Sequence, residues 1–359
     1  MTKRIQLLSL TMAMILTALL FVSCRRQAPT EDETDEFWEV MSLGKETLYL
    51  REEESPDGKY TLVYEKIDDE TCSIRGCGGE LPEDFHIPTE IGTGIRVTKI
   101  QANAFFNLEP MSLKEVWVPD SIEVIEWGIF ISHDLRAIHF GSGIRSIHRM
   151  MCGGNPVVTL SPDNPYLEMV EDGYIVERAT GTLLWAVNAE NIPAGIPYIG
   201  EFSCMGSTAD IITVPDGVLT VGDYAFLECL SVEKLCLPDS VTSIGEGAFW
   251  NSNFEAVIGG RYILVPKEAF KYAQLQNISL PDTVTRIESF AFSTCEELRA
   301  VYIPASVTEI GENAFVGLTN CTIYCEAQSK PDGWAENWLW EDECENVTVI
   351  FGGIQPENT

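Results

Sequence analysis

The chain has 359 residues, of which 45% are hydrophobic, so it is long enough to bury a large core or to fold as two or three domains. Its 55 acidic residues outnumber its 23 basic residues and give a formal net charge of −32. A negative field of this size favours solubility and repels nucleic acid and anionic membrane surfaces. We therefore expect no nucleic-acid partner and no direct binding to a membrane surface.

The first 24 residues indicate export. Lys3 and Arg4 precede an apolar run over residues 5–22, which ends in Ser23 and Cys24. This order is typical of a secretory signal peptide, which we place at residues 1–23. A retained membrane anchor is the alternative, although the run is near the lower length limit for a transmembrane helix. The ending "LLFVSC" resembles the lipobox of bacterial lipoproteins, which implies that Cys24 is lipidated and becomes the mature N-terminus.

Residues 24–39 are polar and acidic and lack an apolar period, so we interpret them as a flexible tether. They resemble the acidic lead of surface-exported lipoproteins of Bacteroidota. Two alternating apolar runs around Pro56, Asp57 and Gly58 then predict a β-hairpin. We assign residues 40–84 to an N-terminal β cap that covers the apolar end of the first repeat.

A motif of the type Ile-Gly-x-x-Ala-Phe recurs through most of the chain. Its last residue returns every 21 to 23 residues in the C-terminal part, and weaker copies occur upstream in the same register. A period of this length predicts a solenoid in which stacked coils complete one another's core. Nine copies, with one gap of 52 residues, place the solenoid at residues 85–325. The phenylalanines predicted to fill its core are Phe105, Phe130, Phe226, Phe249, Phe270, Phe292 and Phe315.

Each coil also contains a predicted strand. In "LRAVYIPAS", Val301 and Ile303 alternate with Ala300 and Tyr302, and this period of two places one side of the strand in the core. Proline after the strand donates no hydrogen bond and ends the ladder, and the next residues turn the chain. The second apolar run of the repeat then returns along another side of the coil.

The same alternation assigns one outward residue per strand to a column beside the proline. None of its members is formally charged, although 22% of the chain is charged. A charge-free face with aromatic side chains is suited to contact a peptide or a glycan. The alternative is that Thr, Tyr and Trp are common on any sheet face. The column comprises Cys236 and the candidate ligand contacts Trp117, His139, Thr213, Ser279 and Tyr302.

Stretches such as "LPDSVTSIGEGAF" and "IYCEAQSKPDGWAENWLW" resemble the BspA (treponemal) type of leucine-rich repeat of bacterial surface proteins, over about residues 85–352. The resemblance implies an α/β repeat that is mostly β, a right-handed solenoid of about nine coils with a parallel sheet. It also implies that the long gap holds an inserted β-hairpin, at about residues 155–193. We assign residues 326–359, which contain Trp334, Trp338 and Trp340, to a C-terminal cap, with a carbohydrate platform as the alternative.

The cysteines divide into two groups. Cys229 and Cys295 recur at one repeat position, which indicates small core residues. Disulfides, which export would permit, stay open for the pair Cys72 and Cys77 and for the group Cys321, Cys325 and Cys344. No Cys-x-x-Cys pair is present and the chain has only four histidines, so we expect no metal site and no cofactor.

The sequence carries no recognised catalytic motif, so we expect no enzyme activity. A catalytic site assembled from distant coils is the open alternative. Short acidic turns at Asp120, Asp239 and Asp282 resemble the acceptor motif for O-glycosylation of exported Bacteroidota proteins, and ordinary turns are the competing interpretation.

The family resemblance implies adhesion or interaction with host or bacterial partners. We therefore predict a monomeric, lipid-anchored outer-membrane protein, exposed on the cell surface, that uses a repeat scaffold to bind a protein or a glycan. A lipoprotein that captures glycan or peptide nutrients is the alternative. Whether the anchored chain faces the cell surface or the periplasm stays open.

Overall fold

The chain folds mostly as short β-strands. Within the described residues it contains no α-helix, and therefore no helix that is long and apolar enough to cross a membrane; a 3-10 helix, η2, spans Glu341–Glu343. The mostly β part of the prediction is thus confirmed, whereas these residues hold no helical part. The signal peptide, Cys24 and nearly all of the tether lie outside the described ranges. The computed structural model describes residues 39–43, 46–92, 94–105, 113–130, 135–147, 156–171, 173–186, 189–254 and 256–353.

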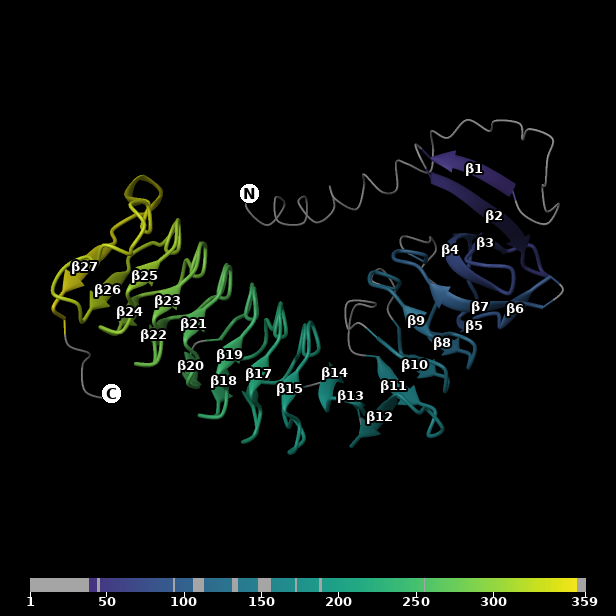
Figure 1. The fold of residues 1–359 in the computed structure, drawn as a ribbon, viewed down its shortest axis with the longest axis horizontal. Helices are drawn as coiled ribbons and strands as arrows, with labels where there is room; N and C mark the ends of the chain where they lie inside the picture. The colour runs from purple at the N-terminus through teal and green to yellow at the C-terminus, as the bar shows by residue number, and fades with distance from the viewer. Residues whose placement is uncertain are drawn as a thin grey trace.

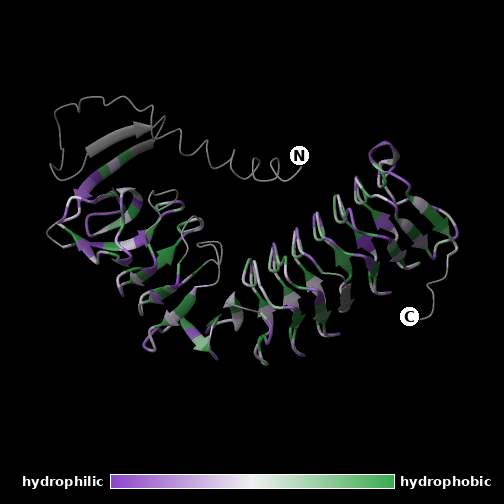
Figure 2. Ribbon diagram, turned by 180° about the vertical axis from the view of Figure 1, so that it is seen from behind, coloured by the Kyte–Doolittle hydropathy of each residue, from purple (hydrophilic) through white to green (hydrophobic). Residues whose placement is uncertain are grey.

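The coils follow one another along an arc and contribute parallel strands to two rows, which confirms the predicted solenoid (Figure 1). Hydrophobic and hydrophilic residues alternate along the coils (Figure 2). The first row consists of β5 (Asp84–His86), β8 (Glu115–Val118), β10 (Ala137–Phe140), β11 (Val157–Leu160), β16 (Ile211–Thr213), β18 (Lys234–Leu237), β20 (Ala256–Gly259), β22 (Asn277–Ser279), β24 (Ala300–Ile303), β26 (Thr322–Cys325) and β27 (Thr348–Phe351). The second row consists of β9 (Val124–Ile125), β15 (Tyr198–Ile199), β17 (Thr220–Val221), β19 (Ser243–Ile244), β21 (Leu264–Val265), β23 (Arg286–Ile287) and β25 (Glu309–Ile310).

The first row has eleven strands, two more than the nine coils counted from the sequence. Strands β11, β26 and β27 belong to turns whose corners lack the Ile-Gly-x-x-Ala-Phe motif. In the coil that ends at Cys204, a single bridge between Asn191 and Thr213 stands in place of a strand. Because β26 and β27 are parallel neighbours, the segment assigned to the C-terminal cap also extends the row by a further turn.

The repeated corner holds the core together. All seven predicted core phenylalanines are fully buried, and the rings of Phe270, Phe292 and Phe315 follow one another at centroid separations of 5.0 Å. At each of five consecutive corners, from Cys204 to Phe292, three backbone N–H groups donate to the next coil. In one coil these bonds run from Tyr224, Phe226 and Glu228 to the carbonyls of Glu246, Ala248 and Trp250, at 2.8 to 3.0 Å.

The insertion is a middle layer of the stack. It forms an antiparallel meander of β12 (Leu167–Val170), β13 (Tyr174–Glu177) and β14 (Thr182–Ala186), and β14 pairs in parallel with β15. A register shift between Ile175 and Val176 leaves one extra residue on β14, as in a β-bulge. Ile175 and Trp185 therefore pack into the N-terminal core cluster, whereas Leu183 packs into the C-terminal one. The predicted single hairpin is thus wrong in strand number, because a third strand, β12, pairs with β13.

The N-terminal cap continues directly into the solenoid. Strands β1 (Glu39–Leu43), β2 (Glu46–Glu54), β3 (Tyr60–Lys66) and β4 (Thr71–Gly79) form an antiparallel meander. Strand β4 then pairs in parallel with β7 (Ile95–Ile100), which also pairs with β6 (Glu90–Ile91) and with β9 of the second row. The cap therefore leaves no free edge between the meander and the first coils.

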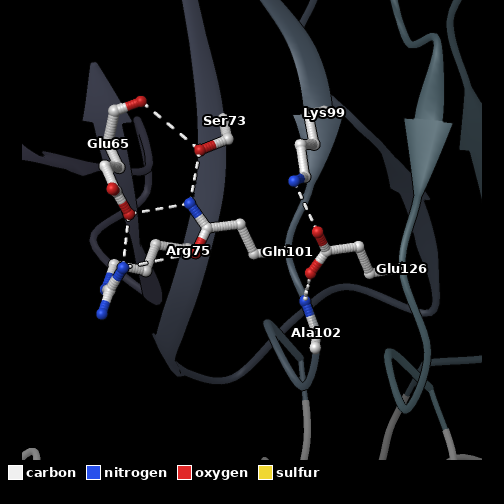
Figure 3. A network of polar contacts seen from close by, with 7 residues as sticks. All are labelled: Glu65, Ser73, Arg75, Lys99, Gln101, Ala102 and Glu126. Atoms are coloured by element: carbon white, nitrogen blue, oxygen red, sulfur yellow. Dashed lines mark hydrogen bonds and ion pairs between the residues drawn. The ribbon is translucent and has the colours of Figure 1, made fainter. Parts of the chain in front are cut away.

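Polar side chains tie the cap to the first coils (Figure 3). Nε2 of Gln101 donates to Oε2 of Glu65 and to Oγ of Ser73, at 2.7 Å each, and Arg75 pairs with the same Glu65 carboxylate. In the next coil Glu126 accepts a hydrogen bond from the backbone of Ala102 at 2.8 Å. Burial alone would raise the pKa of Glu126, but hydrogen bonds from Lys99 and Ala102 hold the pKa below its usual value.

Two of the three C-terminal tryptophans close the core. Trp334 and Trp338 are buried, and Trp338 packs edge-on against Phe315 at 5.6 Å. Nε1 of Trp334 donates to the carbonyl of Val307 at 3.2 Å. Trp340, by contrast, is 46% exposed. This geometry supports the cap and leaves only one of the three indoles open to solvent.

The structure forms none of the disulfides considered from sequence, because the thiols concerned are free. They belong to Cys72, Cys77, Cys321, Cys325 and Cys344. Cys229 and Cys295 are buried, and their Sγ atoms donate to backbone carbonyls of the preceding coil at 3.4 and 3.0 Å. The prediction of small core residues at this position matches their burial.

Thiol alkylation checks this description. Burial raises the pKa of Cys72, Cys321 and Cys325 to about 12. Because the thiolate is the reactive form, we expect iodoacetamide at pH 8 to leave these three cysteines unmodified in the native protein. Mass spectrometry should find them alkylated after denaturation without a reductant. A requirement for reductant would reveal disulfides and contradict the structure.

Candidate ligand-binding face

The outward residues beside the strand ends form one column along the first row. Strand register places neighbours side by side in the N-terminal half, in the order His86, Trp117, His139 and Thr159. In the C-terminal half the order is Thr213 and Cys236, followed further along by Ser279, Tyr302, Tyr324 and Ile350. All six residues assigned to the column from sequence lie in it, and we call this set the outward column.

Sequence reasoning missed four members of the outward column. His86 carried a usable signal, because one residue separates it from Pro88, as one residue separates Trp117 from Pro119. The other three were hidden because their turns depart from the proline spacing used to align the strands. They are Thr159, Tyr324 and Ile350.

Three aromatic rings stack in the N-terminal half of the column. The ring of Trp117 lies 5.4 Å from that of His86 and 3.8 Å from that of His139, with interplanar angles of 4° and 20°. Nδ1 of His139 shares a hydrogen bond with Oγ1 of Thr159 at 2.8 Å, and Nε2 lies 3.8 Å from the carboxylate of Glu115. Trp117 is covered on both faces yet 42% exposed, so it presents its edge to solvent.

A tyrosine pair forms the counterpart in the C-terminal half. The rings of Tyr302 and Tyr324 stack at 4.9 Å with an interplanar angle of 9°. Burial, and to a smaller extent Tyr324, raise the pKa of Tyr302, so its hydroxyl stays protonated at neutral pH and is able to donate a hydrogen bond. A shallow depression opens beside the pair, lined among others by Ser279, Asp282 and Glu326. Tyr302 and Ser279, which are neighbours on adjacent strands, therefore both line the depression.

Exposed apolar residues flank the column near its middle. Val157 and Ile211 precede Thr159 and Thr213 by two residues and are 63% and 49% exposed. Their strands, β11 and β16, border the insertion, where the first row is interrupted. The outward column therefore combines uncharged polar groups, stacked rings and an apolar flank in an acidic chain.

The acidic turns direct their hydroxyl groups towards the scaffold. Oγ of Ser121 is buried, and Oγ of Ser240 accepts a hydrogen bond from the backbone of Gly217 at 3.1 Å. Oγ1 of Thr283 donates to the carbonyl of Tyr262 in the preceding coil at 2.8 Å. These contacts favour a structural role for the turns over O-glycosylation.

Among the residues that the structure describes, no group of three or more His, Cys, Asp and Glu side chains is placed to hold a metal ion. His86 and His139 both lie in the outward column, separated by the indole of Trp117. Both imidazole rings are therefore parts of one stacked surface.

Parallel strands, buried phenylalanines at seven corners and a repeat of 21 to 23 residues in the C-terminal part define a leucine-rich-repeat solenoid. The model of the BspA type leucine rich repeat region matches the chain in six copies, over residues 87–155, 187–259 and 263–330, which together make up more than half of it. The chain therefore belongs to the BspA-type leucine-rich repeat family.

Three solved structures are similar to this chain. A leucine-rich repeat protein from Eubacterium ventriosum is 13% identical, with a TM-score of 0.50 over 82% of this chain and 94% of its own. The pneumococcal vaccine antigen PcpA is 13% identical, with a TM-score of 0.49 over 85% and 99%. A leucine-rich cell surface protein from Faecalibacterium prausnitzii is 18% identical, with a TM-score of 0.37 over 81% and 97%. A search of curated proteins gave no match.

Proposed function

We propose that the protein is an exported surface lipoprotein, anchored through Cys24, that binds another protein through the outward column and acts in adhesion. The outward column carries this proposal, because it holds no Asp, Glu, Lys or Arg although 22% of the chain is charged. Stacked aromatic rings offer a rigid contact area at low entropic cost, which is typical of binding hot spots. The acidic tether would hold the binding region away from the outer membrane.

The stacking geometry favours a protein over a glycan at Trp117. A sugar ring stacks on the open face of an indole, and both faces of Trp117 are covered by imidazole rings. The exposed edge, together with Val157 and Ile211, instead suits the broad, partly apolar contact made by a protein surface. We therefore place the centre of the protein-binding surface at β8 to β16.

Alanine substitution tests this surface. We expect Trp117→Ala to weaken binding of the mature protein to its protein ligand about 30-fold, which corresponds to the loss of about 2 kcal/mol at a hot spot. Interferometry measures the affinity against a panel of immobilised extracellular-matrix and bacterial surface proteins. Together with a glycan array, this panel identifies the ligand.

Trp340→Ala is the matched control, because its indole is exposed to a similar degree and lies outside the outward column. Its affinity should equal that of the natural chain. Equal affinities for Trp117→Ala, Trp340→Ala and the natural chain would exclude the outward column as the binding surface.

Capture of a small glycan is the second candidate, and the depression beside Tyr302 and Tyr324 favours it. Tyr302, Tyr324, Asp282 and Glu326 line one concave surface, which combines aromatic area with a few polar groups, as small-molecule sites do. In this case a single oligosaccharide should bind with micromolar affinity. Its binding should be lost in Tyr302→Ala and retained in Trp117→Ala, whereas binding of a protein ligand should depend on Trp117.

A further inference from the structure

A second set of aromatic side chains lies on the corners of consecutive coils, away from the outward column. The rings of Phe202 and Tyr224 stack at 5.2 Å, Tyr224 meets Trp250 at 5.6 Å, and Trp250 meets Tyr272 at 6.3 Å. Phe290 follows in the next coil. All five side chains are half-buried, so each keeps part of its ring open to solvent. We call these five residues the corner ridge.

The backbone at the corners does not favour aromatic residues. Phe202, Tyr224, Tyr272 and Phe290 have φ values between 51° and 61°. A bulky residue is rare in this left-handed region, which Gly and Asn adopt more readily. At the position of Tyr224, which Phe202 and Phe290 share, other coils carry Asn103, Gly128, Gly247, Glu268 and Asn313. At the position of Tyr272 they carry Glu228, Asn251, Thr294 and Gly317. The solenoid therefore forms without aromatic residues at these sites. Folding alone does not explain why the corner ridge is aromatic.

The neighbouring coil leaves room for one of these rings. A Cβ atom on Gly247 would lie 2.2 Å from Cε1 of Tyr224, so any larger residue at this position would displace the ring. The absent side chain allows Tyr224 to lie across its neighbour and to meet Trp250 beyond it. The corner ridge therefore continues past Gly247, although this residue contributes no ring at the position equivalent to Tyr224.

The corner ridge already binds an ammonium group from its own chain. Nζ of Lys271 lies 5.1 Å from the ring centroid of Trp250, 5.7 Å from that of Tyr272 and 5.6 Å from that of Phe290. Its charge is balanced by Oε1 of Glu268 at 3.0 Å. Three rings and a carboxylate around one cation are the chemistry that recognises lysine and arginine side chains. Lys271 therefore shows which kind of group these rings accept.

Carboxylates surround the remainder of the ridge. Burial raises the pKa of Tyr224 to about 12, and the negative charges of Glu246 and Glu268 contribute to the rise. Lys267 offsets part of this field through its pair with Glu246 at 2.8 Å. Rings with acidic neighbours, in a chain of net charge −32, are complementary to a cationic partner.

We propose that the corner ridge is a second interaction surface, which binds a lysine- or arginine-bearing segment of a partner protein. The incoming cations stack on the exposed parts of Phe202, Tyr224 and Trp250, beside the position that Lys271 fills. This surface is separate from the outward column and does not depend on the function proposed for that column.

Charge-neutral substitutions test the proposal. The probes are fluorescent nonapeptides of arginine, lysine and glutamate, titrated against the mature protein in 150 mM salt, which screens long-range attraction between exposed charges. The natural chain should bind both cationic peptides and not the glutamate peptide. Tyr224→Asn should weaken this binding about 5-fold or more, the effect of losing a cation–π contact. Its thermal midpoint should not fall, since Asn suits the left-handed backbone.

Tyr198→Asn is the matched control, because Tyr198 is an exposed tyrosine of the second row outside the corner ridge. It leaves the net charge unchanged and should bind the cationic peptides like the natural chain. Equal binding by Tyr224→Asn and Tyr198→Asn would overturn the proposal, because net charge alone would then explain the affinity. Failure of the natural chain to bind either cationic peptide would overturn it as well.

A second pair of variants tests the cation cage. Lys271→Met removes the ammonium group from the rings, and Lys267→Met removes the same charge from a lysine that pairs with the Glu246 carboxylate. If the rings accept external cations, Lys271→Met should bind the arginine peptide at least 3-fold more tightly than Lys267→Met. Equal gains in the two variants would contradict recognition by the rings.

Discussion

Replacing Phe292 by alanine should lower the free energy of unfolding by about 3 to 5 kcal/mol, the usual loss for a buried phenylalanine. Phe292 is fully buried, and its ring lies 5.0 Å from the rings of both Phe270 and Phe315. The cavity would therefore interrupt the packing of three consecutive coils. Urea unfolding followed by circular dichroism measures the change.

Phe290→Asn is the matched control for this prediction. Phe290 lies two residues away in the same corner, half-buried, with a φ of 60° that asparagine adopts more easily. The control should unfold at the same urea concentration as the natural chain or at a higher one. Equal destabilisation by Phe292→Ala and Phe290→Asn would contradict the assignment of Phe292 to the core and Phe290 to the surface.

Substitutions in the insertion should act on different halves of the molecule. Trp185→Ala removes the largest fully buried side chain from the N-terminal core cluster, and we expect a loss of about 3 to 5 kcal/mol. Leu183→Ala, two residues earlier on β14, removes packing from the C-terminal cluster, with an expected loss of about 2 to 5 kcal/mol.

Hydrogen exchange distinguishes the two variants, because it reports local unfolding along the chain. Trp185→Ala should increase exchange mainly in β8 to β11, and Leu183→Ala mainly in β15 to β18. The same pattern of exchange in both variants would contradict the description of the insertion as a layer that faces two separate cores.

The repeat predicted the core residues because the stacking of coils causes both the period of the sequence and the burial of the repeated residues. Each Ile-Gly-x-x-Ala-Phe corner must stack on an identical corner, so the sequence repeats wherever the packing does. The buried residues Phe226 and Phe249 followed directly from this rule. The cap tryptophans Trp334 and Trp338 followed from the need to close the last coil.

Features formed by variable positions were predicted less well. Alternation located Trp117 and Tyr302 on the outward face, but no pattern revealed that imidazole rings cover both faces of Trp117. The register shift in β14 depends on pairing within the insertion, so the opposite orientations of Leu183 and Trp185 were not visible in the sequence. The corner ridge was missed because its members occupy positions that vary from coil to coil: the sites of Tyr224 and Trp250, for example, carry Glu268 and Lys271 in a later coil.

Hydroxyl-radical footprinting of the ligand complex tests most directly whether the outward column is the binding surface. With the bound protein partner, we expect lower oxidation of Trp117 and Tyr302. Oxidation of Trp340 and Tyr198, which are exposed outside the column, should not change. Protection of Trp340 or Tyr198 with no protection of Trp117 and Tyr302 would contradict the proposal that the outward column binds the ligand.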